Sequence, residues 1–291
     1  MRLDTNKLLK ACDEWSKRIP EEDIRIQIPA NDAKKRKYLG LSTLATDCQR
    51  AVFYNFRKIA KPAFDPKVLR LFQRGHREEF FFQHMLEGVG LKIYDVDPKT
   101  GEQFKVTDFE GHLSGHMDGI ARDRKKLFVD DDEPFKVEYK TYNDSRYKTL
   151  VKKGVQESDV KYYGQMQGYL GYERRLGGAL FCAVNKNTDE LHFEWVPFNP
   201  SFFQTLQDRA EMVINSAVPP KGISGRRSFW KCKMCSYLDN CLPAQGEPRK
   251  PSIKSCRSCL YAEPAEEARW KCKRGREFGE VCLDWSDCNQ G

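Results

Sequence analysis

The chain has 291 residues, enough for one large domain or two unequal ones. Hydrophobic residues make up 40% of it, and no apolar run reaches the roughly 18 residues that a membrane span needs. The N-terminal segment lacks the apolar stretch of a signal peptide, so we expect a cytoplasmic protein without a membrane partner. A formal net charge of +8 favours an anionic partner, with a solvated basic surface as the alternative.

The spacing of apolar residues predicts a mixture of helices and strands. The first 40 residues are charged and predict a short helix and a loop. Alternating patterns predict antiparallel strands between about residues 91 and 141, and a further strand pair over 177–198. A turn followed by an amphipathic helix is predicted over 39–58, and helices are predicted over 68–90, 157–176 with Ser158 as N-cap, and 200–218. This order predicts an α/β core flanked by helices.

Two of the predicted strands carry charged side chains at alternating positions. In "PFKVEYKT", Glu138 and Lys140 share one strand face, and in "LSGHMDG", Asp118 shares a face with His116. If the strands pair, the two carboxylates and the ammonium converge at one end of a sheet. Oxygen ligands of this kind suit Mg²⁺ or Mn²⁺ and are typical of metal-assisted phosphodiester hydrolysis. A solvent-facing Glu–Lys pair is the alternative, and His116 is a candidate ligand, outer-sphere group or structural histidine.

The charged segments stand in an order that resembles a nuclease superfamily. "GHMDG" and "VEYKT" resemble motifs II and III of the PD-(D/E)XK nucleases. "LFQRGHREEFF" resembles the motif I helix of their RecB-type and phage exonuclease branch, and "YYGQMQGYLGY" resembles the Q-x-x-x-Y helix of that branch. The resemblance spans residues 74–169 and implies a restriction-endonuclease-like α/β core with a mixed central sheet. It also implies a Mg²⁺- or Mn²⁺-dependent deoxyribonuclease.

The resemblance assigns roles to the residues of motifs II and III. Asp118 and Glu138 would be metal ligands, together with the main-chain carbonyl of Tyr139. Lys140 would orient the attacking water.

The two helical motifs supply further candidates. Glu79 would bring a carboxylate to the metal from the motif I helix, directly or through water. His76 and Glu78 compete with it, because many relatives carry histidine at the position that Glu79 holds here. Gln165 and Tyr169 fill the Q-x-x-x-Y pattern and would lie near the scissile phosphate or the DNA end.

Eleven cysteines are present, and an odd number without an export signal argues against a disulfide framework. A C-x-x-C-x5-C segment supplies three thiols, one fewer than a tetrahedral site needs. With one early cysteine added, the arrangement resembles the iron–sulfur staple of the AddB and CRISPR-adaptation nucleases. The resemblance implies a structural [4Fe–4S] cluster, with Zn²⁺ as the alternative, on four ligands: Cys48, Cys232, Cys235 and Cys241.

The last segment of the chain has a second set of cysteines at metal-ligand spacing. Cys256, Cys259 and Cys272 are three ligands of a predicted zinc ribbon or knuckle, and Cys288 or Cys282 is the fourth, with Cys288 preferred. We expect three parts in the chain: a nuclease domain closed by the four-cysteine cluster over 1–241, a linker over 242–255, and the zinc module over 256–291.

A basic segment, 145–155, follows Lys140 and is expected to be a loop that contacts phosphates. The resemblance implies a phage-type exonuclease of DNA recombination or repair, in the cytoplasm of a bacterial host if phage-encoded. Its single-stranded products would pass to an annealing protein. Endonuclease activity and an oligomeric state stay open. The alternatives are a catalytically silent DNA-binding or assembly module on the same scaffold, and a redox or iron-sensing protein.

Overall fold

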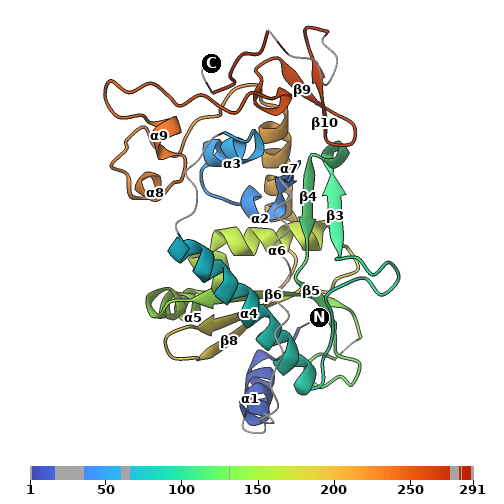
Figure 1. The fold of residues 1–291 in the computed structure, drawn as a ribbon. Coiled ribbons are helices and arrows are strands. Elements are labelled where there is room, and N and C mark those ends of the chain that lie inside the picture. The colour runs from blue at the N-terminus through green and yellow to red at the C-terminus, as the bar shows by residue number, and fades with distance from the viewer. Residues whose placement is uncertain are drawn as a thin grey trace. The chain divides into compact units, whose positions relative to one another are not determined.

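The computed structural model describes residues 2–16, 36–59, 66–130, 132–275, 282 and 284–289 (Figure 1). The chain divides into two compact units, each made of segments that are far apart in sequence. Unit 1 consists of Met1–Lys34, Phe64–Val106 and Gly115–Phe203. Unit 2 consists of Lys35–Ala63, Thr107–Ser114 and Gln204–Gly291.

Unit 1 is built on a five-stranded mixed sheet in the order β2-β5-β6-β7-β8. The central strand β6 is antiparallel to β5 and parallel to β7, and β7 is antiparallel to β8. The strands have these bounds: β2 Lys92–Tyr94, β5 Gly119–Arg122, β6 Phe135–Tyr142, β7 Ala179–Asn185 and β8 Leu191–Val196. All residues of β7 and most of β6 are buried, as expected for strands covered on both faces.

Helices cover the two faces of this sheet with different chemistry. On one face, apolar side chains of β6 and β7 join a core with residues of α1 (Thr5–Ser16) and α4 (Pro66–Gly88). On the other face, α6 (Val160–Tyr172) packs on β6, and α5 (Asp144–Ser158) contacts β7 and β8. Every residue of α6 from Tyr163 to Gly171 is buried. The apolar face anchors the sheet and leaves the α6 face for polar groups of β6.

Unit 2 gathers short elements around one buried helix, α3 (Gln49–Phe56). Its helices are α2 (Leu41–Leu44), α8 (Trp230–Lys233), α9 (Leu238–Cys241) and most of α7 (Pro200–Asn215). A three-stranded sheet has the order β1-β4-β3, with β1 at Leu39–Gly40, β4 at Leu113–His116 and β3 at Lys105–Asp108. A hairpin of β9 (Ala262–Ala265) and β10 (Arg269–Cys272) follows towards the C-terminus.

A buried arginine and a partly buried one connect early and late segments within unit 2. Arg57 is fully buried after α3, and its Nη2 donates a hydrogen bond to the carbonyl of Cys259 at 2.6 Å. Arg209 Nη1 donates to the carbonyls of Leu44 and Thr46, each at 3.1 Å. A hydrogen bond from a charged donor is stronger than one between neutral groups, so these contacts fix the late segments against α2 and α3.

The mixed sheet flanked by helices confirms the expected α/β class, but three local predictions are wrong. Residues 145–155 form most of α5 instead of a loop, because Asn143 caps the helix and Tyr147 and Leu150 are buried on one side of it. Ser158 ends α5 instead of capping α6, and its hydroxyl donates to the carbonyl of Gly154. The segment 126–130 is not a strand, because the Asp123 carboxylate accepts two main-chain N–H groups there.

Among the helices that the structure describes, none combines the length and the apolar character of a membrane-spanning segment.

Candidate active site

Three charged side chains share the face of β6 that α6 covers. They are Lys136, Glu138 and Lys140, at every second position of the strand. Lys136 and Glu138 have 0% of their side-chain surface exposed, and Lys140 has 17%. Glu138 and Lys140 were predicted to share a strand face. Lys136 was not among the predicted site residues, although the same alternation puts Lys136 on the face of Glu138 and Lys140.

The Glu138 carboxylate is held by protein groups from both sides. Its Oε2 accepts hydrogen bonds from Lys136 Nζ at 2.6 Å and from Gln165 Nε2, on α6, at 3.2 Å. Its Oε1 lies 2.5 Å from Lys140 Nζ. Burial alone would raise the pKa of Glu138, but the two ammonium groups outweigh it and hold this pKa at about 2. Glu138 is therefore an ionised carboxylate in a fixed orientation.

The Lys140 ammonium stands where three oxygen atoms converge. Its Nζ donates to the carbonyl of Tyr139 at 2.8 Å and lies 3.7 Å from Asp118 Oδ2, in addition to its contact with Glu138. The Tyr162 ring centroid lies 5.0 Å from the same nitrogen, within the range of a cation–π contact. Burial would lower the pKa of Lys140, but the two carboxylates raise it above its ordinary value, so the side chain stays protonated.

Asp118 reaches this cluster because of the register between β5 and β6. Gly119 pairs with Val137, which brings the preceding Asp118 beside Glu138. A Cβ atom at Gly119 would stand 3.1 Å from Val137 Cγ2 and 3.3 Å from the carbonyl of Tyr94, so glycine allows the close approach of the strands. Burial, and then the charge of Glu138, raise the pKa of Asp118.

The motif I helix α4 brings Glu79 within electrostatic range of the cluster. Burial, followed by the negative charge of Asp118, raises the pKa of Glu79, and its Oε2 lies 3.4 Å from His76 Nδ1. Glu78 instead pairs with Arg74 at 3.8 Å. Of the three candidates on α4, Glu79 is thus the one whose charge interacts with Asp118.

Gln165 and Tyr169 both make contacts inside the site. Gln165 donates to Glu138, as described above, and the Tyr169 hydroxyl donates to the main-chain carbonyl of His116 at 2.5 Å. The Tyr169 ring centroid lies 5.0 Å from Lys136 Nζ. One face of α6 therefore orients the acidic strand and fixes the end of β4 just before Asp118.

The donor set fits a hard divalent cation in kind. Glu138 Oε1 and Asp118 Oδ2 are buried, and the Lys140 ammonium lies 2.5 Å from the first and 3.7 Å from the second. Together with the Tyr139 carbonyl they are the oxygen ligands that Mg²⁺ or Mn²⁺ prefers. Within the described ranges, no three His, Cys, Asp or Glu side chains lie close enough to hold one ion as they stand. Two carboxylates and one carbonyl are therefore the donors that the fold brings together.

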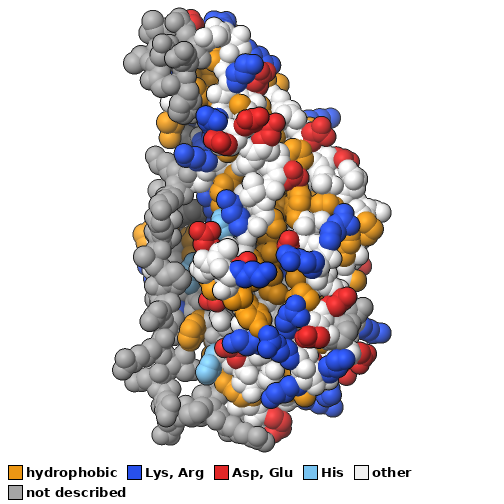
Figure 2. All heavy atoms as spheres, turned by 90° about the vertical axis from the view of Figure 1, so that its right-hand side faces the viewer, with side chains coloured by type: hydrophobic (Ala, Val, Ile, Leu, Met, Phe, Trp, Pro, Cys, Tyr) orange, Lys and Arg blue, Asp and Glu red, His pale blue; other side chains and the backbone are white. Residues whose placement is uncertain are grey.

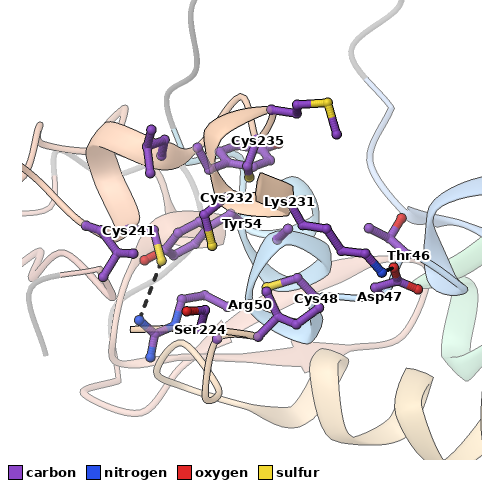
Figure 3. Close-up of a pocket in the computed structure, with 17 residues that line it drawn as sticks. Thr46, Asp47, Cys48, Arg50, Tyr54, Ser224, Lys231, Cys232, Cys235 and Cys241 are labelled. Atoms are coloured by element: carbon purple, nitrogen blue, oxygen red, sulfur yellow. Dashed lines mark hydrogen bonds and ion pairs between the residues drawn. The ribbon is translucent and has the colours of Figure 1, made fainter. Parts of the chain in front are cut away.

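Unit 2 contains a cavity of about 240 Å³ that is lined by the four cysteines predicted to form a cluster. Cys48 precedes α3, Cys232 and Cys241 lie on α8 and α9, and Cys235 lies between these two helices. Figure 3 shows the four cysteines around the cavity, with the Arg50 guanidinium directed at the Cys241 sulfur atom. The fold thus brings an early cysteine and three late ones to one cavity, and a metal group on them stays a prediction.

The thiols of this cavity have one basic partner close by. Arg50 Nη1 donates to Cys241 Sγ at 3.6 Å, and its Nε donates to the carbonyl of Pro220 at 2.7 Å. Burial, and then the charges of Cys241 and Cys48, raise the pKa of Cys232, and burial is the largest cause of a raised pKa at Cys235. Cys232 and Cys235 are therefore protonated near neutral pH, and binding of a metal to them would release protons.

The tail cysteines lie in two overlapping groups. Burial, and then the charges of Cys259, Cys282 and Cys272, raise the pKa of Cys256. Cys288 is fully buried and interacts with Arg57 and Cys259. Both candidates for the fourth ligand, Cys282 and Cys288, are thus near at least one of the other three.

No protein-family model matches the chain, and no curated protein matches it in sequence. Several solved structures are similar in part. A protein called SSO0001 has 16% identity and a TM-score of 0.41, over 80% of this chain and 92% of that one. The alkaline exonuclease LHK-Exo from Laribacter hongkongensis has 12% identity over 61% of this chain and 86% of that one. Its TM-score is 0.40, and 0.43 for its complex with dAMP. TM-scores of this size establish no common fold. A function has to follow from the side chains of the site.

Proposed function

We propose that this protein is a metal-dependent nuclease that hydrolyses phosphodiester bonds in DNA, with Mg²⁺ or Mn²⁺ as its cofactor. The observation that carries the proposal is the convergence of two buried carboxylates, Asp118 and Glu138, and the Tyr139 carbonyl on one point, where the Lys140 ammonium lies. Two carboxylates held side by side in a buried place repel each other. A divalent cation would offset both charges and accept all three oxygens as ligands.

The residues of the cluster have distinct roles in this proposal. Asp118, Glu138 and the Tyr139 carbonyl would hold the ion, and Glu79 would reach it through water. When bound, the ion supplies Lewis-acid activation of the phosphate and of a water molecule. The protonated Lys140 can donate a hydrogen bond to the attacking water or to a phosphate oxygen, and its charge offsets the negative charge that develops there.

Basic side chains on the helix that follows β6 in the chain are in keeping with a phosphate-bearing substrate. Lys148, Lys152 and Lys153 are exposed on α5, which begins two residues after β6 ends. Figure 2 shows that on another face Lys and Arg side chains are mixed with acidic and hydrophobic ones. Contacts of this kind fix a nucleic acid through its backbone without reading its sequence.

The sequence resemblance supports a finer proposal for the substrate and the pathway. In this proposal, the protein is a phage-type exonuclease that acts on linear DNA in recombination or repair and produces single strands for an annealing protein.

For the cysteines, we propose a [4Fe–4S] cluster on Cys48, Cys232, Cys235 and Cys241, with Zn²⁺ as the alternative. All four cysteines line one cavity, so the fold brings the four thiols to the same place. The Arg50 guanidinium would offset part of the negative charge of metal-bound thiolates. The group would have a structural role, because it would tie α3 to the segment that carries α8 and α9.

For the tail, we propose a Zn²⁺ site on Cys256, Cys259 and Cys272. Cys288 stays the preferred fourth ligand, because the buried Arg57 beside it would offset the charge of a metal-bound thiolate. Cys282, which interacts with Cys256, is the alternative.

Digestion of end-labelled linear DNA and of circular duplex DNA, with Mg²⁺ or Mn²⁺, tests the nuclease proposal. The wild-type protein should cut linear DNA only when the metal is present, and cleavage of the circle would identify an endonuclease. Asp118→Ala and Lys140→Ala should each lower the cleavage rate by at least about a hundredfold while the protein keeps a cooperative unfolding transition. Metal-dependent cleavage that persists in either variant contradicts the proposal. Salt-sensitive DNA binding without cleavage by the wild type would identify a silent binding module instead.

A further inference from the structure

The two oxygens of the Glu138 carboxylate have unequal surroundings. Oε2 accepts two hydrogen bonds, from Lys136 Nζ at 2.6 Å and from Gln165 Nε2 at 3.2 Å. Oε1 instead lies 2.5 Å from Nζ of Lys140, which is 17% exposed, and is on the side of Asp118. The buried donors Lys136 and Gln165 thus hold one oxygen, and the other faces the proposed metal site.

Lys136 is an unusual residue for the inside of a sheet. It is fully buried, and its ammonium contacts the Val137 carbonyl at 2.8 Å, Glu138 Oε2 at 2.6 Å and the Tyr169 ring at 5.0 Å. Transfer of an ammonium group from water to such a place is costly unless it is paired, and an apolar side chain would fill the space without that cost. The contacts of Lys136 therefore indicate a role beyond packing.

We propose that Lys136, together with Gln165, fixes Glu138 as a one-oxygen ligand and so makes the site selective for Mg²⁺ or Mn²⁺ over Ca²⁺. This inference rests on the proposed function, because it concerns the metal of that site. Mg²⁺ requires an octahedral shell in which each carboxylate supplies one oxygen, whereas Ca²⁺ takes more ligands and accepts both oxygens of a carboxylate. With Oε2 occupied by two donors, Glu138 cannot bind an ion through both oxygens. Lys136 is a positioning residue, since it acts through Glu138.

A simpler role for Lys136, charge neutralisation, predicts a different outcome. Removal of its positive charge would strengthen the binding of every dication to the site. Mg²⁺ and Ca²⁺ carry the same charge, so this electrostatic effect largely cancels in the ratio of their dissociation constants. A Glu138 Oε2 that is free to bind the ion favours Ca²⁺ alone, because only Ca²⁺ readily accepts both oxygens of a carboxylate. The ratio therefore separates positioning from neutralisation.

Competition binding on the full-length protein, without DNA, tests the inference. Binding of Mn²⁺ is followed by electron paramagnetic resonance of the free ion, and Mg²⁺ and Ca²⁺ are used as competitors. In Lys136→Met, the preference for Mg²⁺ over Ca²⁺ should fall by about tenfold or more, as expected when an outer-sphere partner of a metal ligand is lost. Gln165→Met frees the same oxygen from its weaker donor and should produce a smaller fall. Lys92→Met, on the edge strand β2, removes an exposed lysine outside the site and should leave the preference unchanged.

The outcomes distinguish this inference from the proposed function. An unchanged preference in Lys136→Met and Gln165→Met overturns the inference. If Lys136→Met does not fold, Gln165→Met decides alone, since it acts on the same oxygen. Glu138→Gln should abolish the competed Mn²⁺ site, and if it does not, both the inference and the metal site of the proposed function are wrong. A protein that shows the shift in preference but does not cut DNA would support the inference and contradict the nuclease activity.

Discussion

The acidic cluster of unit 1 and the cysteine cavity of unit 2 bring side chains of one kind together in different ways. In the acidic cluster, Lys136 and Lys140 stand on the same strand as Glu138 and balance its charge. In the cavity, Arg50 is hydrogen-bonded to one thiol of four, and burial keeps Cys232 and Cys235 protonated. The carboxylate of Glu138 is therefore charged in the metal-free protein, whereas the thiols would become charged on binding the proposed metal.

The largest effect that follows from this difference concerns the cysteine cavity. Cys48→Ala should lower the free energy of unfolding by about 5 kcal/mol or more, because the binding energy of a structural metal centre is also folding energy. Chemical denaturation of the freshly purified protein, together with its iron and zinc content, measures the effect. Cys182→Ala removes a buried thiol from β7 in unit 1 and is the matched control. If both variants lose the same stability and metal content, Cys48 is not a ligand.

A smaller loss of stability is expected in the acidic cluster. Glu138→Gln should cost about 3–5 kcal/mol, because it leaves the fully buried Lys136 ammonium without its counter-charge. The pKa of Glu138, about 2, lies below its unfolded value of about 4.3, so the ionised carboxylate stabilises the protein above the unfolded value. This stabilisation is lost as the pH falls through that window. Urea unfolding between pH 7 and pH 3 should show the acid-dependent loss in the wild type and its absence in Glu138→Gln.

Substitution of Asp118 should have the smallest effect on the free energy of unfolding, and it should stabilise the protein instead of destabilising it. Burial and the neighbouring Glu138 raise its pKa, so its ionisation destabilises the metal-free fold. The folded state then holds its proton more tightly than the unfolded state, and stability falls as the pH rises from the unfolded pKa of about 3.9 through the raised value. Asp118→Asn should melt at a higher temperature than the wild type at pH 7 without metal. A lower melting temperature would mean that Lys140 stabilises the Asp118 carboxylate more than burial destabilises it.

Much of the acidic site could be predicted from the sequence, because strand alternation is a local property. The alternation fixed which side of β6 carries Glu138 and Lys140. It could not decide how deep each side chain lies. Lys136 was overlooked for this reason, since a lysine near the start of a strand is ordinarily solvated and only α6 and the parallel neighbour β7 bury it.

Contacts between distant segments were harder to predict. That Gln165 binds Glu138 depends on how α6 crosses β6, which no local pattern specifies. The α5 segment was expected to be a loop because its basic residues obscure the few buried positions that hold the helix, Tyr147, Leu150 and Val155. The four cysteines of the cavity were an exception, since the chemistry of a four-thiol site demands a distant partner whatever the fold.

The glycine after Asp118 has a consequence for how this site could be altered. A methyl group at Gly119 would press on Val137 and on the carbonyl of Tyr94, and the strands would have to part by a few tenths of an ångström. The distance between Asp118 and Glu138 therefore depends on the lack of a side chain at Gly119. A Gly119→Ala protein would keep every charged group of the site and change only how far apart two of them stand.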